Sequence, residues 1–350
     1  MDTKKAGGYE HIVVAVDAMG GDNAPHYPVE GALFAARYYQ ISVILVGNED
    51  VVRAELARHD TRHLSVRIEH APAIPNEGKP AKTALSGEPT PIKVAFELVK
   101  SGEAHAIFTA GHSGLALTTA MVAVGRIMGI ERPALAAPLP SIRGNIVLVD
   151  AGANAGCKPQ TLVQFAWMGS VFAKVVLGFS RPRVGLLSNG IEENKGTAVT
   201  RKAHEMLKNS HLNYCGYIEG NEIMSGRADV VVTDGFAGNL VLKSIEGASE
   251  FIVDSLLDIF VGGALNRVGL ALMRNKIRRF RKKIDYTEYG GAPLLGINAS
   301  CVVGHGRSTP IAIANGIKCA ADFEVKGYRK ALEEQIKLNG VEQSMVGTPI

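Results

Sequence analysis

Short apolar runs rich in β-branched residues recur along the chain, and each ends in glycines or small polar residues before a helical pattern begins. The runs do not alternate with polar residues, which is typical of strands buried on both faces of a parallel sheet. They predict strands at 12–16, 106–110, 146–149, 184–188 and 230–233, and helices over 115–129, 162–178, 200–209 and 240–260. This succession of elements predicts an α/β protein.

The chain shows no composition change that would mark a linker, because Pro, Gly and Ser are spread along its length. It also has no internal repeat with a solenoid period. We therefore expect one α/β domain over residues 11–340, with a disordered extension at 1–10 and a disordered tail at 341–350. Within the domain, residues 251–284 alternate apolar clusters with charges, which predicts an amphipathic helical subregion.

Charge is unevenly distributed. Lys and Arg exceed Asp and Glu by only four in 350 residues, which argues against a general nucleic-acid-binding protein. The decapeptide RNKIRRFRKK at 274–283 holds seven basic residues and no acidic one. The rest of the chain therefore carries a slight excess of acidic residues, and the decapeptide is suited to an acidic partner or an anionic surface.

The four cysteines lie far apart, with no CxxC pair and no Cys/His cluster at zinc-ligand spacing. Neither disulfides nor a structural metal is expected, and a reducing cytoplasm fits this pattern. The first apolar run has five residues and is followed directly by Asp17, so we expect no signal peptide. Charged residues interrupt the stretch 251–273, so we expect no membrane span there, although a helix lying on a membrane is compatible with it.

Small polar residues follow the predicted strands, where the loops of an open α/β sheet bind ligands. Residues 110–114 (AGHSG) predict either a phosphate-binding nest, through glycine φ freedom and a helix N-terminus, or only a tight turn with an N-cap. Asp17, Asp150 and Asp234 each follow a strand, where a carboxylate caps a turn more often than it catalyses. Lys195, near two glycines, is either a cation for phosphate or an oxyanion, or a solvated loop lysine.

Several catalytic signatures are absent from the sequence. There is no GxxxxGK[ST] phosphate loop, no GxSxG nucleophile elbow and no HExxH metal motif. The HxxxxD motif that glycerol-phosphate acyltransferases use as a base is also missing. What remains is the set of small polar residues on the strand-end loops.

Read in order, the loops form a specific series: VAVDAMGGDNAP, AGHSG, GRIMGIERPALA, DAGANAGCKP, RVGLLSNGIEENKGT, ADVVVTDGFAGN and YGGAPLLGINASCVVGHGRS. Between about residues 12 and 322 this series resembles the bacterial acyl-ACP:phosphate acyltransferases of fatty acid and phospholipid synthesis. The resemblance implies a three-layer αβα sandwich with a mostly parallel sheet, similar to isocitrate and isopropylmalate dehydrogenases and to phosphotransacetylase.

The resemblance also implies an activity: transfer of a fatty acyl group from acyl carrier protein to inorganic phosphate. The acyl phosphate would then serve a membrane glycerol-3-phosphate acyltransferase. No metal, cofactor or nucleic acid is implied. A homodimer in the cytoplasm, associated peripherally with the inner face of the plasma membrane, is expected. Because phosphate is a nucleophile at pH 7 and a thioester is an activated donor, positioning and oxyanion stabilisation suffice for this chemistry.

By the same resemblance, Lys195 in NKGT and Asn239 in DGFAGN are the expected catalytic residues: Lys195 binds phosphate or stabilises the tetrahedral intermediate, and Asn239 orients it. His112-Ser113 departs from the Asn-Thr pair that many members of the family carry. Cys157 is not expected to be a nucleophile. The other expected substrate-binding or phosphate-binding residues are Asp17, Gly20, Gly21, Asp22, Gly111, His112, Ser113, Gly114, Asn154, Asp234 and His305.

The subregion 251–284 has three candidate occupants: an anionic membrane, the acidic acyl carrier protein, and a second copy of the chain. Its expected contact residues are Leu270, Leu272, Arg274, Lys276, Arg278 and Arg279. Two other functions stay open at this point. One is phosphotransacetylase-like transfer from acyl-CoA, and the other is a non-catalytic membrane scaffold that recruits lipid-synthesis partners.

Overall fold

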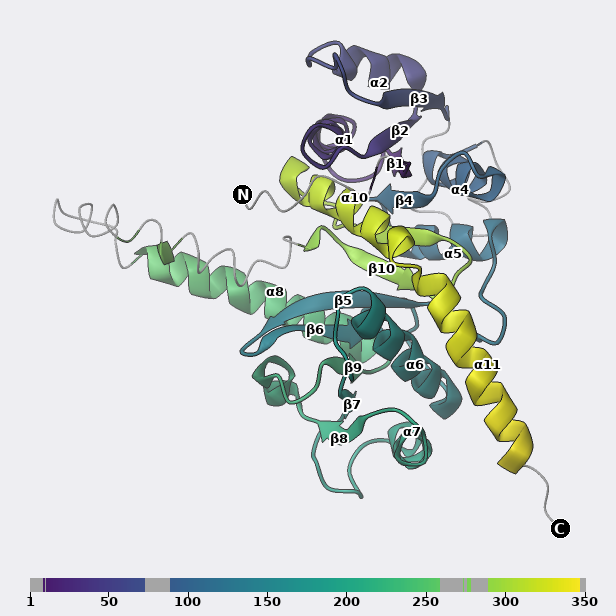
Figure 1. Ribbon diagram of the computed structural model, residues 1–350. Coiled ribbons are helices and arrows are strands. Elements are labelled where there is room, and N and C mark those ends of the chain that lie inside the picture. Colours follow the sequence, from purple (N-terminus) through teal and green to yellow (C-terminus); the bar gives the residue numbers. More distant parts are fainter. Residues whose placement is uncertain are drawn as a thin grey trace.

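The computed structural model describes residues 9, 11–72, 89–258, 273, 276–277 and 289–346. Eleven strands in this part of the chain form one sheet (Figure 1). They are β1 Val13–Asp17, β2 Ser42–Gly47, β3 Val66–His70, β4 Ala106–Thr109, β5 Ala134–Ser141, β6 Gly144–Val149, β7 Val184–Leu187, β8 Tyr214–Ile218, β9 Val230–Val232, β10 Ala292–Leu295 and β11 Ser300–Val303. The helices are α1 His26–Tyr39, α2 Glu49–Leu56, α4 Pro91–Ser101, α5 Ser113–Ala123, α6 Pro159–Val175, α7 Ala198–Lys208, the 3-10 helix η1 Gly220–Ser225, α8 Gly235–Asp258, α10 Pro310–Val325 and α11 Tyr328–Val346.

The strand order is β3-β2-β1-β4-β11-β10-β5-β6-β9-β7-β8, and most neighbours are parallel. The exceptions lie in the middle, where β10 is antiparallel to both β11 and β5, and β5 is antiparallel to β6. The two outer groups of parallel strands therefore run in opposite directions. This mixed, mostly parallel sheet confirms the predicted fold class.

Helices cover both faces of the sheet, as Figure 1 shows. On β1, Val14 and Val16 pack in a cluster with α1 and α10, whereas Ala15 between them belongs to a cluster with α4 and α5. On β6, Val147 and Val149 pack with α6, and Leu148 belongs to the opposite cluster, to which α8 contributes. Because alternate side chains point to opposite faces, a strand between two helix layers must be apolar at every position. The apolar runs of the sequence have this cause.

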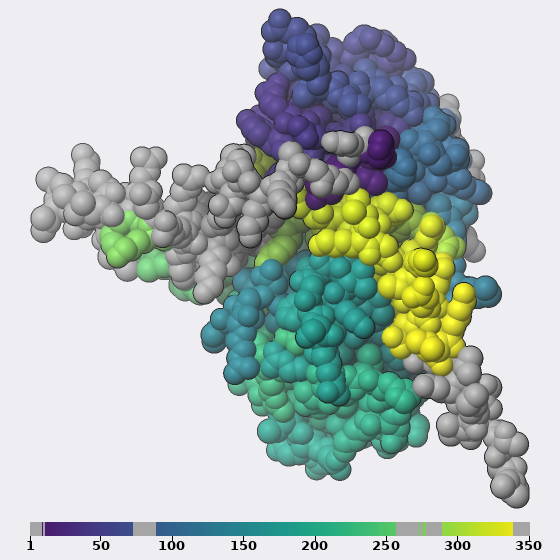
Figure 2. All heavy atoms as spheres, in the orientation of Figure 1, coloured from purple at the N-terminus to yellow at the C-terminus, as the bar shows by residue number. Residues whose placement is uncertain are grey.

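All five predicted strands form, and each predicted helix overlaps an observed one. The predicted helix at 240–260 begins earlier, at Gly235, and extends away from the sheet at its C-terminal end (Figure 1). At the C-terminus of the described chain, α10 packs on α1 and α11 packs on α6. In Figure 2, α10 and α11 (yellow) lie between the purple and blue N-terminal part and the teal and green middle part of the chain. No helix in the described ranges has the length and apolar character needed to cross a bilayer.

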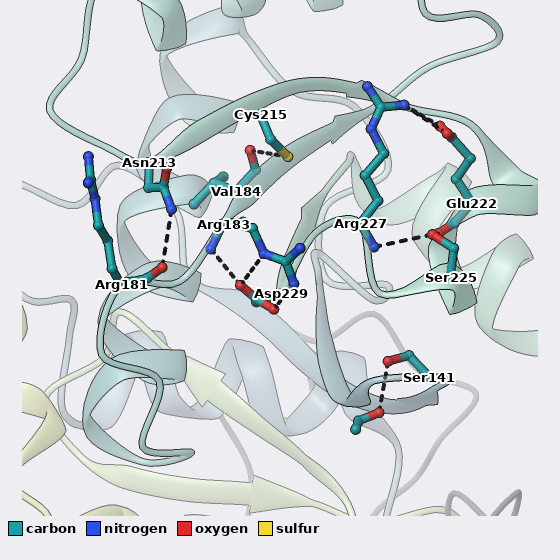
Figure 3. A network of polar contacts seen from close by, with 11 residues as sticks. Ser141, Arg181, Arg183, Val184, Asn213, Cys215, Glu222, Ser225, Arg227 and Asp229 are labelled. Atoms are coloured by element: carbon teal, nitrogen blue, oxygen red, sulfur yellow. Dashed lines mark hydrogen bonds and ion pairs between the residues drawn. The ribbon is translucent and has the colours of Figure 1, made fainter.

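Within the parallel group β6-β9-β7-β8, an ion pair joins the starts of β7 and β9. Arg183 donates from its backbone N–H and its guanidinium to the Asp229 carboxylate just before β9, with Nη2 2.6 Å from Oδ1 (Figure 3). Nearby, Arg227 binds Glu222 in the 3-10 helix. The Arg183–Asp229 pair supports the register in which Val184 on β7 lies beside Val230 on β9.

Candidate functional site

A cavity of about 290 Å³ lies between the two groups of strands. Its walls come from the loops after β4, β6 and β11, from β5, and from one face of α8. The lining includes apolar side chains as well as hydroxyl, imidazole, amide and amine groups. The lining residues are Gly111, Ser113, Leu135, Ala137, Pro138, Ala151, Asn239, Leu242, Lys243, Glu246, Tyr289, Gly290, Gly291, Ala292, Val303, Gly304, His305, Gly306 and Ser308.

Asp17 lies beside this cavity at the end of β1, fully buried. Its Oδ2 accepts a hydrogen bond from the Thr109 hydroxyl at 2.8 Å, and its Oδ1 accepts one from the Met19 N–H at 3.1 Å. Burial raises the pKa of Asp17 to about 6, against the opposing effect of these hydrogen bonds. A Cβ on Gly20 would lie 2.7 Å from Asp17 Oδ2 and 2.8 Å from the Gly111 N, so only glycine fits there.

Gly21 and Asp22, the next two predicted residues, pack on the loop that follows β11. Gly21 has a φ of 99°, in the region that favours glycine, and a Cβ there would lie 3.1 Å from the Gly306 carbonyl oxygen. The Asp22 N–H donates to the same oxygen at 2.9 Å. The segment after β1 is therefore fastened to the loop that carries His305, although the two are far apart in sequence.

The α5 N-terminus faces the cavity through Gly111 and Ser113. His112 is the N-cap, and no side chain of the described residues caps the first turn. Neither Gly111 nor Gly114 has a positive φ, so the nest predicted from glycine φ freedom does not form. A Cβ on Gly111 would lie 3.2 Å from Thr109 Oγ1, and a Cβ on Gly114 would lie 3.1 Å from the ring of the exposed His112, so a side chain at either position requires a small shift of its neighbour. An uncapped helix N-terminus at a cavity attracts anions.

His305 follows β11 and is held by its own loop. Its backbone N–H donates to Ser308 Oγ, and its Nδ1 accepts a hydrogen bond from the Arg307 N–H at 3.1 Å. Partial burial lowers the pKa of His305, and the positive charge of Lys243 lowers it further. The ring is therefore neutral at pH 7.

One face of α8 lines the opposite wall with Asn239, Lys243 and Glu246. Lys243 Nζ lies 2.7 Å from Glu246 Oε2 and 3.0 Å from His305 Nε2. Asn239 was expected from the sequence, whereas Lys243 and Glu246 were not. The signal that would have found them is helical spacing, because residues four and seven positions after Asn239 lie on the same face.

The buried Asp150 carboxylate organises the loop below Asn239. It accepts hydrogen bonds from four backbone N–H groups, and a fifth comes from the Asn154 side chain. The Asn154 amide also donates to the Pro133 carbonyl at 2.7 Å. Asp234 caps α8, since its Oδ1 accepts from the Ala237 N–H. Burial raises the pKa of Asp150. Asp17, Asp150 and Asp234 thus all stabilise turns, as the capping interpretation expects.

Lys195 is not among the described residues that line the cavity. Its loop follows β7, which β9 separates from β6, and none of the described lining residues of the cavity comes from this loop. The Lys195 N–H donates to the Glu192 carbonyl, and Thr197 caps α7 two residues later. The structure therefore brings Asp17, Gly20, Gly21, Asp22 and residues 111–114 to the His305 loop and Asn239, but Lys195 approaches from a separate strand.

Two further groups bear on the chemistry. His26 Nδ1 and His59 Nε2 both contact Glu55 Oε1, at 2.7 and 3.2 Å, in a geometry that could hold a metal ion. The Glu55 carboxylate is already paired with both rings and with Arg58, and these contacts lower its pKa to about 2. We interpret the cluster as a link between α1 and α2.

Burial raises the pKa of the Cys157 thiol to about 12, which agrees with its rejection as a nucleophile.

The subregion 251–284 lies mostly outside the described residues. This applies to Leu270, Leu272, Arg274, Arg278 and Arg279. Lys276 is described, and it is helical and exposed. Residues 251–258 form the end of α8, where Phe251 and Ile252 are exposed.

Comparisons with known proteins bear on the whole chain. The family model described as "Fatty acid synthesis protein" matches residues 12–330. The phosphate acyltransferase of Geobacter sulfurreducens is 45% identical over 325 residues, which cover 93% of this chain and 94% of that protein. The phosphate acyltransferase of Syntrophotalea carbinolica is 46% identical over 336 residues, covering 96% and 97%. A phosphotransacetylase from Streptococcus pyogenes has a similar fold, with a TM-score of 0.56 over 92% of this chain and 94% of that chain, at 16% identity.

Proposed function

Because this chain belongs to the fatty acid synthesis protein family, as its motifs predicted, we propose that it is a phosphate acyltransferase. It transfers a fatty acyl group from an acyl-ACP thioester to inorganic phosphate, and the acyl phosphate is used for phosphatidic acid synthesis. The observation that carries the proposal is the cavity, which combines apolar side chains with Asn239, Ser113 and His305. The apolar side chains suit the acyl end of a thioester, and the polar ones suit the phosphate.

The reaction needs no enzyme nucleophile. An oxygen of HPO₄²⁻ attacks the thioester carbonyl carbon, a C–O bond forms, and the C–S bond breaks. The proton of the phosphate ends on the departing thiol, so the products are a doubly charged acyl phosphate and free carrier thiol. Catalysis then consists of holding the two reactants together and stabilising the tetrahedral oxyanion.

In this proposal Asn239 and Lys195 are the catalytic residues. Asn239 stands on α8 and lines the cavity, in contact with Gly152, whose φ of 135° is a backbone conformation that favours glycine. Its amide N–H orients the tetrahedral intermediate. Lys195 reaches the intermediate from the β7 loop, and its charge stabilises the oxyanion or binds phosphate. The thioester therefore lies at the Asn239 edge of the cavity, toward that loop.

The remaining predicted residues shape the site. The segment after β1, with Asp17, Gly20, Gly21 and Asp22, supports the His305 loop through the contact with Gly306. The α5 N-terminus at 111–114 contributes its helix dipole to phosphate binding. Asn154 and Asp234 position the loop beneath Asn239.

The partners belong to the proposal as well. The donor is acyl carrier protein, an acidic protein that a basic patch at 274–283 would attract. The exposed Phe251 and Ile252 at the end of α8 favour a contact surface in this region, for a dimer partner or an anionic membrane. We propose a homodimer in the cytoplasm that associates with the inner face of the plasma membrane and supplies a membrane glycerol-3-phosphate acyltransferase.

The experiment that tests the proposal incubates purified protein with palmitoyl carrier protein and inorganic phosphate, and traps acyl phosphate with hydroxylamine. We expect a hydroxamate that requires phosphate and is lost in Lys195→Ala, with the exposed Lys330→Ala as the matched control. Palmitoyl-CoA at equal concentration serves as the second donor. Faster transfer from palmitoyl-CoA would show that acyl-CoA, and not acyl carrier protein, is the donor. If neither donor gives a product, the non-catalytic membrane scaffold becomes the favoured function.

A further inference from the structure

Two nitrogen-bearing side chains, Lys243 and His305, meet in the cavity at hydrogen-bond distance. Lys243 Nζ, from α8, lies 3.0 Å from Nε2 of His305, from the loop after β11. The Lys243 side chain is 48% exposed, so its amine is accessible to a small ligand. Both residues line the cavity.

The hydrogen count at His305 defines what this pair lacks. Nδ1 accepts a hydrogen bond from the Arg307 N–H, so its lone pair is in use. A neutral ring with this arrangement carries its proton on Nε2, the atom that faces Lys243. Lys243 offers three hydrogens and accepts none. The Nε2–H and the ammonium group therefore both point donors into one space, and an oxygen of an anion placed beside both would accept from each.

The surroundings favour an anion over a neutral acceptor. The buried Glu246 accepts from one hydrogen of Lys243 at 2.7 Å and holds the amine at the wall. The α5 N-terminus is uncapped by any described side chain, and its first residue, Ser113, lines the same cavity. A lysine, an imidazole N–H and a helix N-terminus around one cavity form a set of donors suited to a tetrahedral oxyanion.

We propose that Lys243 and His305 form a phosphate subsite, with Glu246 as the positioning residue for Lys243. The ligand is inorganic phosphate. The same chemistry would also accept the phosphate group of a phosphopantetheine arm, and the experiment below separates the two. The inference rests on the proposed function only in making this phosphate the acyl acceptor. Lys195 then acts on the developing oxyanion, and Lys243 holds the nucleophile.

The first experiment measures binding without any acyl donor. Equilibrium dialysis with radiolabelled inorganic phosphate compares wild type, Lys243→Met and Lys202→Met. Lys202 is the matched control, since it pairs with Glu205 three residues later at the same 2.7 Å but lies on the surface of α7. We expect Lys243→Met to weaken phosphate binding by roughly 10- to 100-fold, as for loss of a charge-assisted hydrogen bond, and Lys202→Met to bind like wild type.

A second arm repeats the dialysis with pantetheine 4′-phosphate. Weakened inorganic phosphate binding in Lys243→Met supports the subsite, whatever happens to the ester. If Lys243→Met binds inorganic phosphate within twofold of wild type, the proposed subsite is wrong. If Lys243→Met loses only the binding of pantetheine 4′-phosphate, Lys243 and His305 bind the acyl donor instead. Because no transfer is measured, failure of the acyltransferase assay leaves this result intact, and the reverse also holds.

Removal of Lys243 leaves the buried Glu246 carboxylate without a cation among the described residues, which can destabilise the fold. The double variant Lys243→Met/Glu246→Gln removes that charge and keeps the test available if the single variant unfolds. Glu246→Gln alone keeps Lys243, so we expect a raised KM for phosphate with kcat nearly unchanged. His305→Gln retains an N–H donor, and we expect it to bind phosphate several-fold more tightly than His305→Ala.

Discussion

The Thr109 hydroxyl donates a hydrogen bond to the Asp17 carboxylate across the ends of the parallel strands β4 and β1. Both side chains are buried, and the Asp17 pKa is raised to about 6. Thr109 Oγ1 also accepts a hydrogen bond from the Gly111 N–H. One polar pair thus connects the strand that carries the first glycine-rich loop with the strand that leads into α5.

The first prediction concerns the pH dependence of stability. The folded-state pKa of Asp17 lies above its unfolded value, so the folded protein binds more protons, and the free energy of unfolding falls as pH rises from about 4 to 6. The shift corresponds to about 3 kcal/mol. We expect Asp17→Asn to remove this slope. Urea unfolding at pH 4, 5, 6 and 7 measures it in both proteins. The raised pKa of Asp150 contributes equally to both. Parallel pH curves for the two proteins would contradict the assignment.

The second prediction compares two glycines of α8. A Cβ on Gly238 would lie 1.8 Å from the Asp150 carbonyl oxygen, whereas a Cβ on Gly247 meets nothing within 4 Å. We expect Gly238→Ala to destabilise the protein by about 3 kcal/mol, because α8 must move away from β6. Gly247→Ala should stabilise it by about 0.5–1 kcal/mol through helix propensity. Thermal unfolding of both variants measures the difference, and equal melting temperatures would argue against this packing of α8.

The elements of the fold were predictable because each depends on local pattern. Val13 to Val16 and Val230 to Val232 are apolar at every position, and this pattern identifies strands between two helix layers. The antiparallel β10 and β5 in the middle of the sheet were not predicted. Their pairing joins residues about 160 positions apart, such as Leu294 and Leu135, and a single sequence carries no local signal for such a contact.

The site was predictable to a similar extent. Asp17, the loop at 111–114 and His305 were found because strand ends of one direction meet at one edge of a sheet. Lys243 was missed, since it lies within α8 and not on a strand-end loop. Its role depends on how α8 crosses the sheet, and Gly238 and Asp150 determine that crossing by long-range packing.

The third prediction tests the ion pair at the start of β7. Arg183 makes a bidentate contact with Asp229, which is 8% exposed, and this contact raises the pKa of Arg183 (Figure 3). Arg183→Met would leave a buried carboxylate with fewer donors, so we expect a loss of about 2–3 kcal/mol. The control is Arg62→Met, which removes a bidentate pair with Asp60 at the surface. We expect no measurable change there. Chemical denaturation compares them, and equal losses would show that burial of Asp229 is unimportant.

The last prediction separates a structural from a binding role for Asn154. Both contacts of its side-chain NH₂ are made within the protein, to Asp150 Oδ2 and the Pro133 carbonyl. Its remaining side-chain atom, the amide oxygen, only accepts hydrogen bonds, so it offers no donor to the charged oxygens of phosphate. We therefore expect Asn154→Ala to lower the free energy of unfolding by about 2 kcal/mol, because the buried Asp150 loses a donor. The KM for phosphate should stay within about twofold of wild type, since no phosphate contact is lost.

The control for this variant is Asn209→Ala, because the Asn209 NH₂ donates to the Glu205 carbonyl at the exposed end of α7. It should change neither stability nor KM. Thermal unfolding and phosphate titration of the acyl-transfer rate are measured on all three proteins. If Asn154→Ala raised the KM for phosphate tenfold while its melting temperature stayed at the wild-type value, Asn154 would be a binding residue, and its hydrogen bonds to Asp150 and Pro133 would have to open when phosphate enters.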